Sequence, residues 1–249
     1  MKSNVGQKSR RSGKALQAKK ARAPFRILIT GGGCVEPIDD VRAITNSSTG
    51  KTALQIARVI LAKNPAAAIT LLQSERAVQP AGALAKKIVV KNFRSCSDIK
   101  KLLQDELCDK PYDLIFHAAA VSDYTVKSVV VDGKEFAAGK VHKISGAADV
   151  RINLKLNPKL LQELSRLAKK KNAAARVVGF KLTSGASGKE REAAVQKLFS
   201  AKNPPDFVLS NDLSEITAKS HPCVLWGKGG TIARGQISSL VRKIYDIDC

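Results

Sequence analysis

Aromatic residues are scarce in this sequence of 249 residues, which contains seven Phe, three Tyr and one Trp. So few aromatic side chains argue against surfaces that bind nucleic acids by stacking on bases. No apolar run approaches the roughly 20 residues that a transmembrane helix needs, so we expect no membrane partner. The apolar fraction of 44% and the charged fraction of 26% are typical of a globular protein with a sizeable core.

The usual signs of a disulfide framework or a histidine-built metal centre are also missing. The five cysteines are widely separated and form no C-x-x-C pair, and the three histidines stand at unrelated spacings. This pattern argues against a zinc site and predicts a reducing compartment, so we expect a cytoplasmic protein. We interpret His117, His142 and His221 as structural.

Acidic residues are absent from the first 35 positions, whereas residues 1–26 contain nine Lys or Arg. A segment of this composition cannot bury enough apolar surface to fold alone, so we predict that residues 1–24 form a basic disordered tail. It could be a solvated arm, residues added in cloning, an organelle presequence or a nucleic-acid-binding segment. The formal net charge of the whole chain is +22. Much of the surplus lies beyond the tail, which suits an anionic substrate.

Strand-like and helix-like segments alternate along the rest of the chain. A hairpin around Gly229-Gly230 and a last helix near 236–245 follow the alternating part. This order predicts an α/β fold: a Rossmann-like, mostly parallel sheet with helices on both faces, plus a flap or hairpin extension. We predict one domain over residues 25–249, with a loop or flap at 126–150, where no clear period exists. Strands are predicted at 25–30, 68–74, 87–93, 112–121, 176–182 and 206–212, and helices at 49–63, 97–107 (capped by Ser97), 157–171 and 189–202.

Two loops rich in Gly, Ser and Thr lie within GGGCVEPIDDVRAITNSSTGK, residues 31–51. The first has Glu36-Pro37 where a dinucleotide-binding G-x-G-x-x-G loop has its third glycine. The second ends like a Walker A loop but lacks the opening glycine. It precedes a helix, where hydroxyls at 47–49 and free backbone N–H groups could bind an anion, or could simply cap the helix. Two such loops at strand ends predict one cleft for two anionic partners.

These loops resemble the signature of phosphopantothenoylcysteine synthetases, particularly the free-standing bacterial type. The resemblance extends from residue 25 to about 213. It implies a ligase of coenzyme A biosynthesis that joins 4′-phosphopantothenate to L-cysteine. A nucleotide would activate the carboxylate as an acyl-nucleotide, releasing pyrophosphate, and the cysteine amine would then displace the nucleoside monophosphate. Further family blocks follow in order: AAAVSDY (118–124), HKIS (142–145), NPKLL (157–161), VGFKL (178–182) and KNPPDFVLSNDL (202–213).

The resemblance also implies cofactors and a role for individual residues. It favours CTP over ATP, a homodimer, and Mg²⁺ bound through substrate phosphates, with the protein's metal ligands unknown. Asn46 would hold the acyl-nucleotide and polarise its carbonyl, Lys143 would meet the triphosphate, and Arg42 would reach phosphopantothenate from a neighbouring subunit. The remaining implied contacts are Ala119, Ala120 and Asp123 for substrate, and Gly32, Ser48, Gly50, Lys143, Phe180, Lys202 and Asn211 for nucleotide.

Some positions depart from the family pattern, and other functions stay open. Cys34 stands where the family usually has Thr, Ala53 replaces a glycine, and Lys197 is displaced by one position. Each implied site residue also has an ordinary structural explanation as a turn, cap or core residue. The net charge raises a basic nucleic-acid-binding Rossmann-like protein as an alternative, and the glycines raise, less strongly, an NAD(P)-dependent oxidoreductase.

Overall fold

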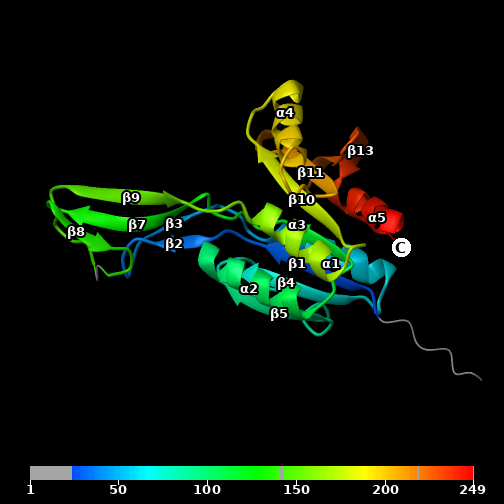
Figure 1. The fold of residues 1–249 in the computed structure, drawn as a ribbon, viewed down its shortest axis with the longest axis horizontal. Helices are drawn as coiled ribbons and strands as arrows, with labels where there is room; N and C mark the ends of the chain where they lie inside the picture. The colour runs from blue at the N-terminus through cyan, green and yellow to red at the C-terminus, as the bar shows by residue number, and fades with distance from the viewer. Residues whose placement is uncertain (1–23, 141–142, 218, 249) are drawn as a thin grey trace, which may run out of the picture.

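The computed structural model describes residues 24–140, 143–217 and 219–248, so the predicted tail lies almost entirely outside the described residues. Its largest element is an eight-stranded sheet with the order β13-β12-β11-β10-β6-β1-β4-β5 (Figure 1). Six strands are parallel, and the last two form an antiparallel hairpin at one edge. The strands are β1 (Arg26–Gly31), β4 (Ala68–Ser74), β5 (Ile88–Phe93), β6 (Leu114–His117), β10 (Arg176–Thr183), β11 (Phe207–Asp212), β12 (Pro222–Gly227) and β13 (Gly230–Gln236).

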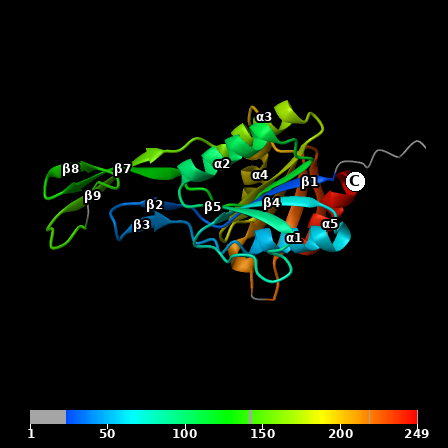
Figure 2. The same cartoon turned by 90° about the horizontal axis from the view of Figure 1, so that it is seen from below.

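Helices cover both faces of this sheet because successive strand residues point to opposite sides. Ile27 and Ile29 of β1 pack beneath α1 (Lys51–Lys63) and α5 (Ile237–Asp248). Leu28 faces α2 (Cys96–Asp109) and α3 (Leu160–Lys171) on the other side (Figure 2). The helix α4 (Gly188–Phe199) packs its Val195 and Phe199 against β11 and β12. The predicted Rossmann-like α/β fold is confirmed.

The segment predicted as a loop or flap contains strands. A separate three-stranded sheet has the order β8-β7-β9, with β7 (Tyr124–Val131), β8 (Lys134–Ala137) and β9 (Val150–Leu156). Together with the ribbon of β2 (Val35–Pro37) and β3 (Ala43–Thr45), it projects from one side of the main sheet, and we call these five strands the arm (Figure 1). The strand β9 begins where the predicted flap ends, and its sequence VRINLKL alternates apolar and polar residues, so a strand signal was present there and was missed. The predicted domain boundaries remain a prediction.

A small core holds the arm together. Ile38, Val126, Val129 and Ile144 are buried against one another. Glu36 in β2 is also buried, and its carboxylate accepts hydrogen bonds from the backbone N–H of Cys96 at the start of α2 and from the hydroxyl of Thr125 in β7. This one side chain therefore ties the arm to the body.

The N-terminus of α2 corrects a prediction about its cap. Ser95, not Ser97, is the N-cap: its Oγ accepts from the backbone N–H of Asp98 at 3.2 Å. The carboxylate of Asp98 accepts in return from the backbone N–H of Ser95 at 2.8 Å. This reciprocal capping box satisfies two of the free N–H groups at the helix start.

The described cysteines Cys34, Cys96, Cys108 and Cys223 are free thiols, and only Cys108 is exposed. Burial raises the pKa of Cys34 and of Cys223 to about 12, and that of Cys96 to about 11. The thiol of Cys34 packs in the core beside Leu28 and Leu72, so the Thr-to-Cys departure falls at a core position rather than in the cleft described below. Over the part of the chain that the structure describes, no helix combines the length and apolarity needed to cross a bilayer.

Candidate active site

A cleft of about 1830 Å³ opens at the carboxyl ends of the parallel strands. After β1 the chain continues to β4 and β5 on one side, whereas β6, β10 and β11 lie on the other. The strand order therefore reverses between β1 and β6, which is where open α/β sheets bind ligands. Gly31 at the end of β1 and Ala118–Ala120 after β6 line the cleft at this point.

The N-terminus of α1 enters the cleft without a side-chain cap. The N-cap residue is Gly50, with a left-handed φ of 72°, and it provides no side-chain cap. The side-chain contact at this end is a long one, from the backbone N–H of Lys51 to Oγ1 of Thr49 at 3.5 Å. The N-cap position is therefore a glycine rather than Ser or Thr, and the residues at 47–49 line the cleft. Uncapped N–H groups at a helix start and the positive end of the helix dipole together favour an anion.

Asn46 lies where the two glycine-rich loops meet β6. Its Nδ2 donates to the carbonyl of Ala120 at 3.1 Å, and the same carbonyl accepts from the backbone N–H of Cys34 at 3.2 Å. A Cβ at Gly33 would collide with the carbonyl oxygen of Asn46, so only glycine allows this approach. One N–H of the Asn46 amide is used in this contact, which leaves the other N–H and the carbonyl oxygen.

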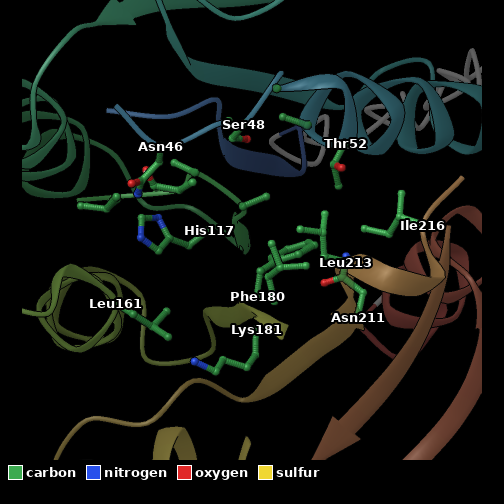
Figure 3. A pocket seen from close by; sticks show the side chains of 18 of the residues that line it. Asn46, Ser48, Thr52, His117, Leu161, Phe180, Lys181, Asn211, Leu213 and Ile216 are labelled. Atoms are coloured by element: carbon green, nitrogen blue, oxygen red, sulfur yellow. The ribbon is translucent and has the colours of Figure 1, made fainter. Parts of the chain in front are cut away.

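His117, which the sequence led us to interpret as structural, lies in the wall of the cleft (Figure 3). Its Nδ1 is 3.0 Å from Oγ1 of Thr30, and that hydroxyl accepts from the backbone N–H of Ala119 at 3.1 Å. Burial lowers the pKa of His117 to about 4, so its ring is neutral at neutral pH. Its position, ending a buried strand directly before three alanines, is the sequence signal that could have identified it.

The opposite end of the cleft combines an aromatic ring with a polar pair. Phe180 of β10 and Asn211 of β11 face the cavity in Figure 3. The Nδ2 of Asn211 is 2.8 Å from Nε2 of His221, whose pKa is lowered by burial. His221 also lines the cleft, so a second histidine set aside by the sequence analysis belongs to this region.

Lysines give the cleft a positive character. Lys159 pairs with Asp123 at 2.7 Å, and both side chains are more than half exposed. Other lysines of the lining come from α1, β10, α4 and the loop after β11: Lys51, Lys181, Lys197 and Lys219. Clefts lined by one sign of charge raise the local concentration of oppositely charged ligands.

The structure brings most of the expected site residues into this one cleft. These are Asn46, Ser48, Gly50, Ala119, Ala120, Asp123, Phe180 and Asn211. Gly32, Arg42, Lys143 and Lys202 do not line it. Lys197, the displaced lysine, lines the cleft instead of Lys202.

The residues outside the cleft have other surroundings. Gly32 has a φ of 85°, and a Cβ there would meet the Cβ of Ser74 at 2.6 Å, so it serves a tight turn. Arg42 and Lys143 are exposed on the arm. The buried carboxylate of Asp39 accepts from a guanidinium N–H of Arg42 at 2.6 Å and from the backbone N–H of Ile144 at 3.0 Å, which fixes the two segments together. His142 lies outside the described residues.

Comparison with known proteins identifies relatives over most of the chain. The family model described as "DNA/pantothenate metabolism flavoprotein C-terminal domain" matches residues 23–233. A "Coenzyme A biosynthesis bifunctional protein CoaBC" of Thermococcus kodakarensis is 29% identical over 203 residues, 82% of this chain and 45% of the relative. The protein of the same name from Methanocaldococcus jannaschii is 30% identical over 190 residues, 76% of this chain and 41% of the relative. The chain thus spans less than half the length of these curated relatives.

Solved structures share the fold. The DNA/pantothenate metabolism flavoprotein from Streptococcus pneumoniae superimposes with a TM-score of 0.74 at 24% identity, over 90% of this chain and 97% of that one. A Cab2 mutant in complex with phosphopantothenate-cysteine gives a TM-score of 0.65 at 17% identity, over 89% of this chain and 86% of that one.

Proposed function

This chain belongs to the family of DNA/pantothenate metabolism flavoprotein C-terminal domains, and from this we propose that it joins 4′-phosphopantothenate to L-cysteine through an acyl-nucleotide. The observation that carries the proposal is the placement of Asn46 between the two glycine-rich loops at the strand switch point. Relatives named for coenzyme A biosynthesis and a similar fold that holds phosphopantothenate-cysteine support it.

The cleft suits a reaction between two anions. When a carboxylate attacks an α-phosphate, catalysis comes mainly from positioning the two reactants and from compensating their negative charges. A protein nucleophile is not required. We infer that the nucleotide base lies near Phe180 and Asn211, and that the phosphates approach the uncapped start of α1 and Lys197. Phosphopantothenate would then extend past Asn46 toward Asp123.

We propose CTP rather than ATP as the activating nucleotide, and a cytoplasmic reaction, on the resemblance of the sequence to the bacterial enzymes. We also propose that Mg²⁺ accompanies the nucleotide. Among the described residues no group of three or more His, Cys, Asp or Glu could hold a metal. The lining offers the carboxylates of Asp123 and Glu190, which fits an ion that keeps most of its ligands on water and phosphate. Such an ion would neutralise phosphate charge when bound.

We propose further that two copies assemble through the arm. The strand β9 carries Val150, Ile152, Leu154 and Leu156 on one face, and all four are between 39% and 63% exposed. It is also an edge strand of its sheet. Edge strands with exposed apolar faces are sites for pairing with another chain. In such a dimer Arg42, which does not line its own cleft and pairs with Asp39 through one guanidinium N–H, would offer its remaining N–H groups to the partner's cleft.

The alternatives receive less support from the fold. After β1 the chain enters the ribbon strand β2 rather than a helix, so the strand–loop–helix unit of a dinucleotide-binding loop is not formed there. The nucleic-acid alternative rests on net charge alone, and family membership favours the ligase.

Pyrophosphate release by the full chain tests the proposal. With phosphopantothenate, Mg²⁺ and CTP we expect release before cysteine is added, and product after it. ATP in place of CTP tests the choice of nucleotide. Absence of pyrophosphate with both nucleotides would overturn the proposed function, whereas equal rates would overturn only the preference for CTP.

A further inference from the structure

His117 uses only one of its two ring nitrogens within the protein. Nδ1 lies 3.0 Å from Oγ1 of Thr30. Across the residues that the structure describes, Nε2 has no hydrogen-bond partner. It is not fully buried, since the fully buried side-chain atoms without a partner are Oε1 of Gln73 and Oγ of Ser165. The residue lines the cleft, and Figure 3 shows its ring in the cleft wall, so we take Nε2 as the ring nitrogen that a ligand there can reach.

The hydrogen bonds around Thr30 favour one of the two neutral tautomers of the His117 ring. A threonine hydroxyl has one proton to donate and can accept as well. It accepts from the backbone N–H of Ala119, and Nδ1 of His117 is the acceptor within reach of its proton. We therefore assign the hydrogen of the neutral ring to Nε2, because this tautomer gives the Thr30 proton an acceptor, whereas an Nδ1–H would leave that proton without one. The cleft is thereby supplied with an uncharged N–H donor.

This donor and the amide of Asn46 are held by hydrogen bonds that lead to the adjacent residues Ala119 and Ala120. Asn46 bonds to the carbonyl of Ala120, and His117 is linked through Thr30 to the N–H of Ala119. Figure 3 shows both side chains at the same end of the cleft. Asn46 keeps one N–H beyond its bond to Ala120, so two N–H donors border the same space.

We propose that His117 is a catalytic residue of the proposed ligase reaction, donating its Nε2–H to the oxyanion that forms when cysteine attacks the acyl-nucleotide. The inference rests on the proposed function and adds a second donor beside Asn46. Neutral histidine can act as a hydrogen-bond donor to a reacting carbonyl, and a donor aimed at a developing oxyanion contributes mainly to the chemical step.

The bonds in this step balance without a proton from the histidine. The cysteine nitrogen forms a bond to the acyl carbon, and the carbonyl π electrons move to the oxygen. When that pair returns, the bond from carbon to the phosphate oxygen breaks and the nucleoside monophosphate leaves with the bonding electrons. The proton of the amine goes to water or to the departing phosphate, because an imidazole with a pKa of about 4 is a poor base.

Two substitutions separate this role from simple packing. In His117→Gln the side-chain N–H reaches about as far as Nε2, whereas in His117→Asn it replaces Nδ1 and faces Thr30. In single-turnover runs, acyl-nucleotide is formed first and cysteine is then added. We expect His117→Asn to slow amide formation about 100- to 1000-fold, and His117→Gln to retain much more of the rate. Pyrophosphate release and KM for nucleotide should change little in either variant.

The reverse order of the two variants would overturn the inference, because a structural partner of Thr30 is better replaced by Asn than by Gln. Equal rates in wild type and both variants would overturn it too. If wild type forms no acyl-nucleotide, the proposed function fails and takes this inference with it. Nitrogen-15 NMR of the histidine rings gives a readout independent of turnover: we expect His117 as the Nε2–H tautomer at pH 7, and an Nδ1–H tautomer would contradict the proposal.

Discussion

The side-chain amide of Asn46 donates to the carbonyl of Ala120 and is proposed to donate to the acyl oxygen of the intermediate. A single substitution tests both contacts. In Asn46→Asp, a carboxylate would face the carbonyl of Ala120 and would offer no N–H to a developing oxyanion. We expect acyl-nucleotide formation to persist while its transfer to cysteine slows about 100- to 1000-fold. Rapid-quench runs without cysteine should show a burst of pyrophosphate. A folded variant without that burst would place Asn46 in the earlier step.

Gly33 makes the position of Asn46 possible, since a Cβ there would collide with the Asn46 backbone. We expect Gly33→Ala to shift the loop and to lower Tm by about 3–10 °C. Activity should fall by more than the fraction of unfolded protein at the assay temperature accounts for. Gly188→Ala is the matched control, because a Cβ at Gly188 meets nothing within 4 Å. Thermal unfolding of both variants checks this, and equal Tm values would show that the loop has room.

Individual site residues were predictable where a short motif fixes their place. Asn46, Ser48 and Gly50 fall in the cleft because they lie between a strand end and a helix start, and chain order alone determines that. His117 was missed because a histidine at the end of an apolar strand resembles a core residue, and His221 because it stands in the loop directly before β12. Only the sheet order shows that both positions border the cleft. Arg42 and Lys143 depend on the arm, whose course the sequence did not show.

Among the elements, strand β9 carries the clearest prediction. If its apolar face is covered by a second copy, Leu154→Asp should weaken self-association roughly 100-fold or more, because each dimer would lose two buried Leu side chains. Lys155→Asp places the same side chain on the opposite face of the strand and should leave association nearly unchanged. Sedimentation velocity over a range of concentrations measures both. A wild-type chain that stays monomeric would refute the proposed dimer.

The elements of the main sheet were predictable, whereas those of the arm were missed, although β9 alternates apolar and polar residues in its sequence VRINLKL. Strands such as β1 and β6 are buried on both faces and so appear as continuous apolar runs. The strand β7 varies irregularly in burial and has a register shift between Val126 and Ser128, which breaks the alternation that identifies a strand. The Ser95 cap was missed because Ser95 and Ser97 are equally suited by residue type, and only the position of Asp98 distinguishes them.

At the scale of the whole molecule, the proposed dimer predicts that Arg42 on the arm of one copy completes the cleft of the other copy. In a mixture of Arg42→Ala and Asn46→Asp chains, a mixed dimer would contain one cleft with an intact Asn46 facing an intact partner Arg42. If Arg42 acts across the dimer, inactive single variants should regain about a quarter of wild-type activity after subunit exchange. Mixing without any recovery would show that Arg42 acts within its own chain or does not act at all.

The burial of three thiols limits the side reactions that the proposed chemistry could cause within the enzyme. An acyl phosphate anhydride is an electrophile toward any accessible thiolate, and the intended acceptor itself bears a thiol. Cys34, Cys96 and Cys223 are enclosed and have pKa values of about 11 to 12, so they stay protonated at neutral pH. They are therefore shielded both from self-acylation by the enzyme's own intermediate and from mixed disulfides with incoming cysteine. Of the cysteines in the described ranges, Cys108 alone is exposed to such reactions, and it lies near the end of α2, outside the cleft.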